Sequence, residues 1–179
     1  MKIFLSRNKV PNLICFACAV AFIAINLHVL AIGLLPIDDH EIVMASSDPL
    51  GSWLNSEAFH PWSRWRPSYY TIRYLEAQLW QNNAFAWHAA RLIGIGAGIF
   101  LLSLSSIRII GKATAILLGI ALVFSPVLNY LVQILGPAET YCFLGLSLWA
   151  YGCTGLLKSF GLLDNEPDTS SAERISEAK

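Results

Sequence analysis

Long apolar runs separated by polar segments dominate the pattern along this chain. The first run extends from about residue 12 to residue 35, and later runs cover residues 91–110, 113–135 and 140–157. A helix needs about 20 predominantly apolar residues to cross a hydrocarbon core of about 30 Å. The four runs therefore predict an all-α integral membrane protein with about four transmembrane helices. The fourth run is short, so we expect its polar ends to reach toward the interface.

A cleaved signal peptide is the alternative interpretation of the first run. The apolar part of such a peptide is about 7–15 residues long. The run from residue 12 to residue 35 is longer, and it contains Asn26 and His28 in its second half. We therefore interpret it as an uncleaved membrane anchor.

The segment between the first two runs, residues 36–90, is a long loop rich in polar and aromatic residues. Within it, residues 69–81 have the spacing of an amphipathic helix. Its apolar stripe consists of Ile72, Leu75 and Leu79. Tyrosine and tryptophan side chains surround this stripe, and such rings accumulate at the lipid headgroups. We expect this helix, and a second short one over residues 52–59, to lie in the plane of the membrane interface.

Basic residues at the ends of the runs predict how the chain is oriented. With four spans, both termini lie on the same side of the membrane. The residues that this arrangement gathers there are Lys2, Arg7, Lys9, Arg108, Lys112 and Lys158. Cytoplasmic loops carry an excess of lysine and arginine. We predict a multi-pass protein of the cell membrane (inner or plasma membrane) with both termini in the cytoplasm. The 36–90 loop then lies outside, and residues 158–179 form a polar cytoplasmic tail that we expect to be disordered.

Composition supports the membrane class and excludes others. Of the 179 residues, 55% are hydrophobic and 13% are charged, whereas soluble domains carry about 25% charged residues. The mean hydropathy is +0.54. The net charge is zero and no basic stripe is present, so nothing favours binding of nucleic acid. The four cysteines all lie within apolar runs, and we interpret the C-x-x-C at Cys15 and Cys18 as buried small residues.

Two features inside the apolar runs have structural interpretations. Gly94, Gly96 and Gly98 resemble a nucleotide loop in spacing, but they lie within a predicted span with no strand before them. Close helix packing through small residues accounts for them better. Pro126 lies within the third run and predicts a kink there.

An acidic pair follows the first run at once. Asp38 and Asp39 come directly after Leu34-Leu35-Pro36-Ile37. One carboxylate of such a pair is suited to act as a general base toward a hydroxyl nucleophile. Its neighbour could orient it, contact the acceptor or bind a divalent cation, although the sequence requires no metal or other cofactor. The simpler interpretation is that these charges mark the point at which the helix leaves the lipid.

Other charged residues of the outer segments could complete a site. Arg64 and Arg66 stand among tryptophans, a combination suited to a phosphate or pyrophosphate on a lipid carrier. Arginines at a membrane edge also reach toward lipid phosphates in general. His88 opens the second run, and Glu139 lies in the other outer turn. The simpler interpretation of Glu139 is a solvated carboxylate favoured by the dipole at a helix N-terminus.

The order of these motifs resembles a known family. The order is an anchor, Asp38-Asp39, Arg66-Pro67, an amphipathic helix, Asn82-Asn83-Ala84-Phe85-Ala86-Trp87-His88 and a second span. It resembles the N-terminal part of polytopic glycosyltransferases of the GT-C fold, which include protein O-mannosyltransferases and bacterial lipid-linked-sugar transferases. Gly136-Pro137-Ala138-Glu139-Thr140 is similar to a second acidic turn of that group. The resemblance covers roughly residues 10–155.

The resemblance implies a function. In that family the acidic motif of the first outer loop supplies the catalytic base or a contact to the acceptor. We expect transfer of a sugar from a polyprenyl-phosphate donor to a hydroxyl acceptor at the outer face. Asp38 or Asp39 would act catalytically, and Arg64, Arg66, His88 and Glu139 would bind substrate.

Family members usually have many more spans, and often a C-terminal soluble domain. This difference predicts a shortened or partial member, or a small relative that needs a partner to supply further spans. The alternative hypothesis is a non-catalytic membrane subunit that uses the Gly94–Gly98 face and its span surfaces to bind a larger transferase or transporter.

Overall fold

Helices make up almost all of the structure. The computed structural model describes residues 10–34, 45–47, 67–135 and 139–163, and this part of the chain contains no strand. Four of the predicted site residues lie outside it: Asp38, Asp39, Arg64 and Arg66. The short helix predicted over residues 52–59 and most of the predicted C-terminal tail also lie outside the described residues.

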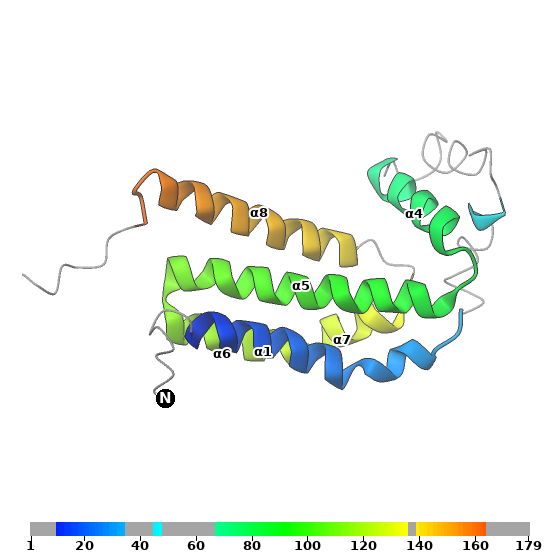
Figure 1. Cartoon of the computed structure of the whole chain (residues 1–179), viewed down its shortest axis with the longest axis horizontal. Coiled ribbons are helices and arrows are strands. Elements are labelled where there is room, and N and C mark those ends of the chain that lie inside the picture. The colour runs from blue at the N-terminus through cyan, green and yellow to red at the C-terminus, as the bar shows by residue number, and fades with distance from the viewer. Residues whose placement is uncertain (1–9, 35–44, 48–66, 136–138, 164–179) are drawn as a thin grey trace, which may run out of the picture.

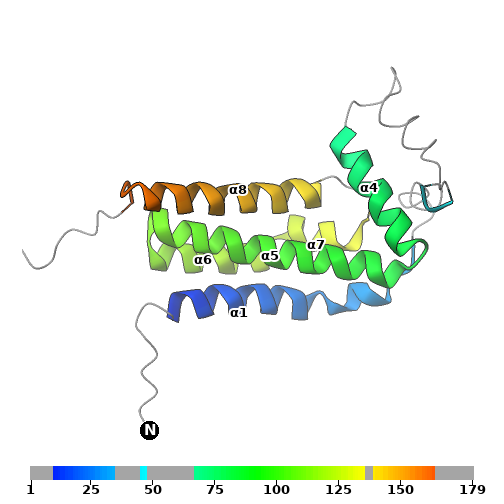
Figure 2. The same cartoon turned by 45° about the horizontal axis from the view of Figure 1, so that its top comes forward.

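The helices form an antiparallel bundle around one central helix. The bundle consists of α1 (Val10–Ile25) with the 3₁₀ helix η1 (Leu27–Ala31), α5 (Ala84–Ile110), α6 (Lys112–Val123), α7 (Pro126–Gln133) and α8 (Glu139–Ser159). The central helix is α5, which contacts α1, α6, α7 and α8. The start of α1 and the end of α8 lie at one end of the bundle, and α4 (Pro67–Trp80) lies at the other (Figure 1, Figure 2).

Three helical segments are long and apolar enough to cross a membrane. They are Val10–Ala31, Ala84–Ile110 and Glu139–Ser159. The pair α6 and α7 reaches the same length and hydropathy together, but the two helices are bent by 45° at a short break. The predicted all-helical fold is thus confirmed with three candidate spans, and the bent pair would make a fourth.

The second candidate span begins earlier than the apolar pattern predicts. Residues 84–90 were expected in the outer loop, but they form the first two turns of α5. Asn83 precedes them as the N-cap, and its side chain accepts a hydrogen bond from the backbone nitrogen of Ala86. Asparagine is a favoured N-cap because it satisfies one of the free N–H groups of the first turn. The cap, rather than the onset of hydrophobicity, sets the start of this helix.

The predicted kink at Pro126 is confirmed. Proline has no backbone N–H and is tolerated in the first turn of a helix. Here Pro126 begins α7, and the Ser125 side chain caps that helix by accepting from the backbone nitrogen of Leu128. The break between α6 and α7 is therefore a new helix start, and the 45° bend occurs there.

The glycines of α5 allow two neighbouring helices to approach closely. A Cβ atom on Gly98 would lie 2.5 Å from the Phe143 ring of α8, and a Cβ on Gly96 would lie 2.9 Å from Ile23 of α1. Gly94 faces Leu144 of α8. The predicted role in helix packing is confirmed, and the alternative hypothesis is corrected on one point. Gly96 and Gly98 are covered by α1 and α8 of this chain, so the Gly94–Gly98 face is not free to bind a partner.

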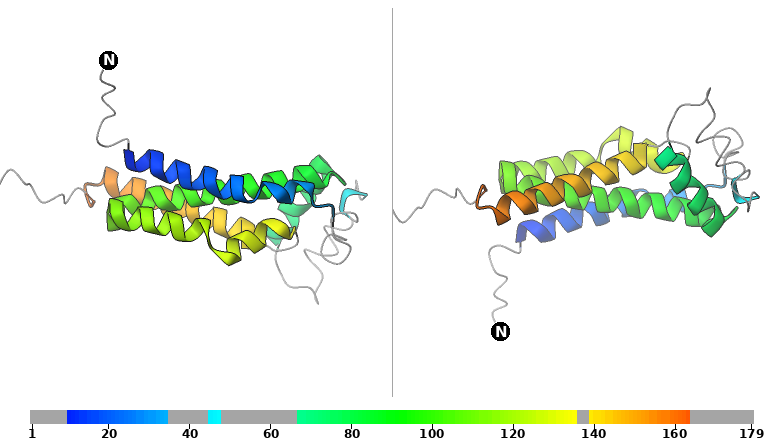
Figure 3. Two further views of the ribbon diagram at one scale, coloured as in Figure 1. Left: turned by 90° about the horizontal axis from the view of Figure 1, so that it is seen from below. Right: turned by 90° about the horizontal axis from the view of Figure 1, so that it is seen from above.

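Helix α4 is amphipathic as predicted, but its charged side faces inward. Ile72, Leu75 and Leu79 are 41%, 61% and 73% exposed, whereas Arg73 and Ala77 are completely buried. The helix lies across the end of the bundle and is joined to α5 by a tight connection at Gln81–Asn83 (Figure 3). An apolar outer face and a charged inner face are the reverse of the usual arrangement in a water-soluble protein.

Candidate functional site

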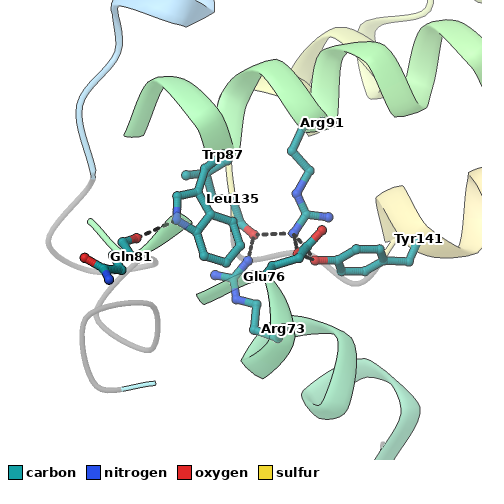
Figure 4. A network of polar contacts seen from close by, with 7 residues as sticks. All are labelled: Arg73, Glu76, Gln81, Trp87, Arg91, Leu135 and Tyr141. Carbon is teal, nitrogen blue, oxygen red and sulfur yellow. Dashed lines mark hydrogen bonds and ion pairs between the residues drawn. The ribbon is translucent and has the colours of Figure 1, made fainter. Parts of the chain in front are cut away.

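Arg73 of α4 is buried at the end of the bundle. Its side chain has no exposed surface, and its Nη1 donates a hydrogen bond to the backbone carbonyl of Leu135. The guanidinium lies 5.1 Å from the centre of the Trp87 ring, within the range of a cation–π interaction. Trp87 is itself held by a hydrogen bond from its Nε1 to the Gln81 carbonyl, 2.8 Å long (Figure 4).

Arg91 of α5 reaches the same carbonyl from the other side. Its Nη2 lies 3.4 Å from the Leu135 oxygen, 2.6 Å from the Tyr141 hydroxyl and 3.7 Å from Oε2 of Glu76. The guanidinium stacks on the Tyr141 ring at 4.1 Å. The Tyr141 hydroxyl in turn donates to the Glu76 carboxylate, so arginine, tyrosine and glutamate form one connected network (Figure 4).

Local sequence explains how these side chains meet. Arg73 and Glu76 are three residues apart and share the inner face of α4, and Trp87 and Arg91 are four apart on α5. Leu135 follows Ile134, the C-cap of α7, and lies outside the helix, so its carbonyl has no helical partner. We call Arg73, Glu76, Arg91, Tyr141 and the Leu135 carbonyl the arginine cluster.

The charges of the arginine cluster do not balance. It contains two arginines and one carboxylate, and Arg91 is only 2% exposed. Within the described part of the chain, the Nε and Nη2 of Arg73 and the Nε and Nη1 of Arg91 have no hydrogen-bond partner. Buried charges are stable only when they are paired and hydrogen-bonded. Four unpaired nitrogens on two buried guanidinium groups make this cluster suited to an anion.

His88 lies on α5 beside the arginine cluster. Its imidazole is buried, and Nδ1 is 3.2 Å from the carbonyl of Val132, near the end of α7. A carbonyl only accepts hydrogen bonds, so Nδ1 is the donor, and this bond ties α5 to α7. Nε2 is buried without a hydrogen-bond partner among the described residues. The predicted substrate-binding residue is therefore enclosed by its own helix bundle.

Glu139 is the first residue of α8 and is exposed. Among the described residues it has no hydrogen-bond or ion-pair partner. Tyr141, two residues further along α8, joins the arginine cluster. The position of Glu139 fits the simpler interpretation of a solvated carboxylate at a helix N-terminus.

A small apolar cluster lies next to Arg73 and includes residues from before and after residues 35–44. It contains Ala45, Ala77, Trp87 and Leu135, and Leu34 packs against it. The side chain of Gln78 on α4 donates a 2.7 Å hydrogen bond to the Ala45 carbonyl. Leu34 and Ala45, the described residues on either side of residues 35–44, thus both lie at this end of the bundle.

The sequence pattern indicates one residue of this region, His88, and does not indicate the members of the arginine cluster. His88 stands out before the second run, and the amphipathic pattern over residues 69–81 predicts the helix that carries Arg73 and Glu76, but not that these two side chains face the bundle. The available signal was the spacing of Arg73 and Glu76 on one face. Nothing in the local sequence indicated Tyr141 or the main-chain oxygen of Leu135, which are about 65 and 62 residues away from their α4 partners.

No group of three or more histidine, cysteine, aspartate or glutamate side chains that could hold a metal ion occurs within the ranges that the structure covers. Comparisons of the chain with family models, curated proteins and solved structures found no match. The arrangement of side chains is therefore the basis for the functional proposal, together with the order of motifs in the sequence.

Proposed function

We propose that this is a multi-pass membrane protein of the GT-C type, which transfers a sugar from a polyprenyl-phosphate donor to a hydroxyl acceptor at the outer membrane face. The observation that carries the proposal is the arginine cluster. Arg73 and Arg91 are buried at the end of an apolar bundle, and two nitrogens of each have no hydrogen-bond partner among the described residues. A phosphate carried by a lipid would match both the charge and the apolar surroundings.

The distribution of charge supports the proposed orientation. Arg108, Lys112 and Lys158 lie at the end of the bundle that contains the start of α1 and the end of α8 (Figure 1). The positive-inside rule assigns that end to the cytoplasm. Arg73 and Arg91 lie at the opposite end, and their side chains are buried in contacts rather than displayed on a loop. Because they are not part of a basic loop, these two arginines do not conflict with an outer location for their end of the bundle.

The proposed base comes from the acidic pair. Asp38 and Asp39 lie outside the described residues, and we propose that one of them removes the proton of the acceptor hydroxyl. Support comes from Leu34 and Ala45, which both pack into the apolar cluster with Trp87, directly below the Arg73 guanidinium. Arg64 and Arg66 remain proposed contacts to the donor phosphate.

The test is sugar transfer by the purified chain in lipid nanodiscs. Radiolabelled polyprenyl-phosphate mannose, glucose and galactose are offered with an extract of membrane lipids and glycans as acceptors. We expect label to move to an acceptor, and Asp38→Asn or Asp39→Asn to abolish the transfer without reducing expression. Asp164→Asn, in the C-terminal segment, is the matched control. Full activity in both acidic variants would contradict the assignment of the base.

A non-catalytic subunit is the second candidate, and helix α8 favours it. Leu146, Leu148, Trp149 and Leu156 of α8 are all exposed. Gly145 and Gly152 of the same helix have open space around them, in contrast to the covered glycines of α5. This face could pack closely against a protein partner that supplies further spans. Purification in mild detergent bears on the choice, because a stoichiometric partner without sugar transfer would favour the subunit hypothesis.

A further inference from the structure

We propose that Arg73 and Arg91 together form a single seat for the phosphate group of a membrane lipid, and that the Glu76 carboxylate occupies this seat until the phosphate displaces it. The inference deepens the proposed function and rests on its lipid-linked phosphate. It adds the residues that hold the phosphate and the residue that competes with it.

The two guanidinium groups converge on one atom. Arg73 and Arg91 both donate a hydrogen bond to the Leu135 carbonyl, so the two guanidinium groups share one acceptor oxygen (Figure 4). The Trp87 ring covers one face of the Arg73 guanidinium, and the Tyr141 ring covers one face of the Arg91 guanidinium. Each ring thereby holds the plane of its guanidinium. The unpaired nitrogens belong to both side chains rather than to one. A tetrahedral phosphate presents oxygens in several directions and can accept from two such groups at once.

Glu76 is held less tightly than the arginines. Its carboxylate lies 3.7 Å from Arg91, longer than a charge-assisted hydrogen bond, and its hydrogen bond comes from the Tyr141 hydroxyl. The side chain is 19% exposed, whereas Arg91 is 2% exposed. Glu76 can therefore rotate outward while Arg91 keeps its place on the Tyr141 ring. The phosphate would then take the place of the Glu76 carboxylate and accept hydrogen bonds from the Tyr141 hydroxyl and the Arg91 guanidinium.

The surroundings of the seat favour a phosphate that is attached to a lipid. The outer face of α4 carries Ile72, Leu75 and Leu79, all exposed, on the helix that supplies Arg73 and Glu76. Such a face offers apolar contact to an acyl or prenyl chain, which adds to binding in proportion to the area covered. Inorganic phosphate has the same charged group but gains nothing from this surface.

Binding to the full chain in detergent micelles tests the seat. The probes are polyprenyl phosphate, the matching polyprenol and inorganic phosphate, with binding followed by native mass spectrometry. We expect polyprenyl phosphate to bind and the polyprenol to bind at least about tenfold more weakly, the factor for one charge-assisted hydrogen bond. Equal binding of the polyprenol would overturn the seat. Competition by inorganic phosphate at equal concentration would overturn the lipid part and leave a site for free phosphate.

Variants test the role of each residue. Arg73→Gln and Arg91→Gln should each weaken binding of polyprenyl phosphate about tenfold or more. Arg108→Gln is the matched control, because Arg108 also stacks on a tyrosine, Tyr151, at 4.6 Å but at the other end of the bundle. Unchanged binding in both seat variants, or an equal loss in Arg108→Gln, would overturn the assignment.

Glu76→Gln gives a test that does not depend on removing an arginine. It removes the competing charge, so polyprenyl phosphate should bind about tenfold more tightly, and the lipid should raise the melting temperature of this variant more than that of the wild type. A purely structural Glu76 would lower the melting temperature and leave the shift caused by the lipid unchanged. That outcome, or weaker binding, would overturn the competition. If the arginine variants do not fold, this comparison decides.

The outcome is separable from that of the proposed function. Lipid binding that depends on Arg73 and Arg91, in a protein that transfers no sugar, would support the seat and contradict the glycosyltransferase. Sugar transfer by a protein whose two arginine variants still bind the lipid like the wild type would support the glycosyltransferase and contradict the seat.

Discussion

The side-chain amide of Asn26 donates a 2.6 Å hydrogen bond to Oδ1 of Asn129, and this bond joins the two places at which the apolar helices break. Asn26 follows the end of α1, and its Nδ2 also donates to the Phe22 carbonyl, 3.0 Å away. Asn129 lies in α7, and its Nδ2 donates to the carbonyls of Ser125 and Val123 near the end of α6. The Phe22 and Ser125 carbonyls also accept from the backbone nitrogens of Asn26 and Asn129. The Asn129 amide adds a partner for the Val123 carbonyl near the end of α6, and backbone polar groups in an apolar layer need such partners.

Replacement of Asn129 by leucine should destabilise the bundle. Asn129→Leu removes the bond from Asn26 and leaves the Val123 carbonyl without its side-chain partner, at a cost of about 1–3 kcal/mol. Thermal unfolding in detergent measures the effect. Asn12→Leu, an exposed asparagine on α1, is the control. Equal melting temperatures for the two variants would show that the asparagine pair contributes nothing.

Replacement of Gly98 by alanine should disturb the contact between α5 and α8. The added methyl would lie 2.5 Å from the Phe143 ring, which has to move, and such overpacking costs about 1–3 kcal/mol. A second substitution, Phe143→Leu, should recover part of the loss because it removes the ring that the methyl meets. Chemical denaturation in mixed micelles compares the single and double variants.

The control for this prediction is Gly152→Ala, at a position of α8 with open space around it. That change should be neutral or stabilising by up to about 1 kcal/mol, because alanine is the better helix former. A loss of stability at both glycines would mean that close packing against Phe143 is not the cause.

Removal of the Tyr141 hydroxyl should weaken the attachment of α4. This hydroxyl accepts from Arg91 and donates to Glu76, so Tyr141→Phe breaks both bonds and keeps the ring. We expect a loss of about 1–3 kcal/mol, in the range for hydrogen bonds to charged groups, and faster proteolysis near α4. Tyr151→Phe, which keeps the ring under Arg108, should have little effect. Similar losses in the two variants would contradict a special role for the Tyr141 hydroxyl.

The proposed orientation predicts which positions are accessible from outside the cell. Ser47 is exposed and lies two residues after Ala45, whose carbonyl accepts from Gln78 of α4, and Ser159 is the exposed last residue of α8. In intact cells a membrane-impermeant maleimide should label Ser47→Cys and should label Ser159→Cys only after permeabilisation. The reverse pattern would place the arginine cluster on the cytoplasmic side. The wild-type chain is the background control because it has four cysteines of its own.

The apolar pattern predicts most of the bundle because the length of a span and the spacing of its small residues are local properties of the sequence. The runs anticipate the helices, the glycines of α5 anticipate its close contacts, and Pro126 anticipates the bend. The start of α5 was placed too late, since the Asn83 cap extends the helix into less hydrophobic sequence. The roles of Asp38, Asp39, Arg64 and Arg66 remain predictions.

The arginine cluster could not be predicted from local patterns. The stripe of Ile72, Leu75 and Leu79 defines two faces of α4, but it does not say which face is covered by protein. In a membrane protein the apolar face can point away from the bundle, and the structure turns Arg73 inward instead. Its partner is a main-chain oxygen 62 residues later, which no side-chain pattern marks.

That main-chain oxygen has a consequence for genetics. Replacing Leu135 by any other residue leaves a carbonyl at the point where Arg73 and Arg91 meet. A scan of side-chain substitutions would therefore report position 135 as a simple apolar contact and overlook the atom at the centre of the cluster. Changes near Leu135 that redirect this carbonyl would affect both arginines together, although they alter no charged residue.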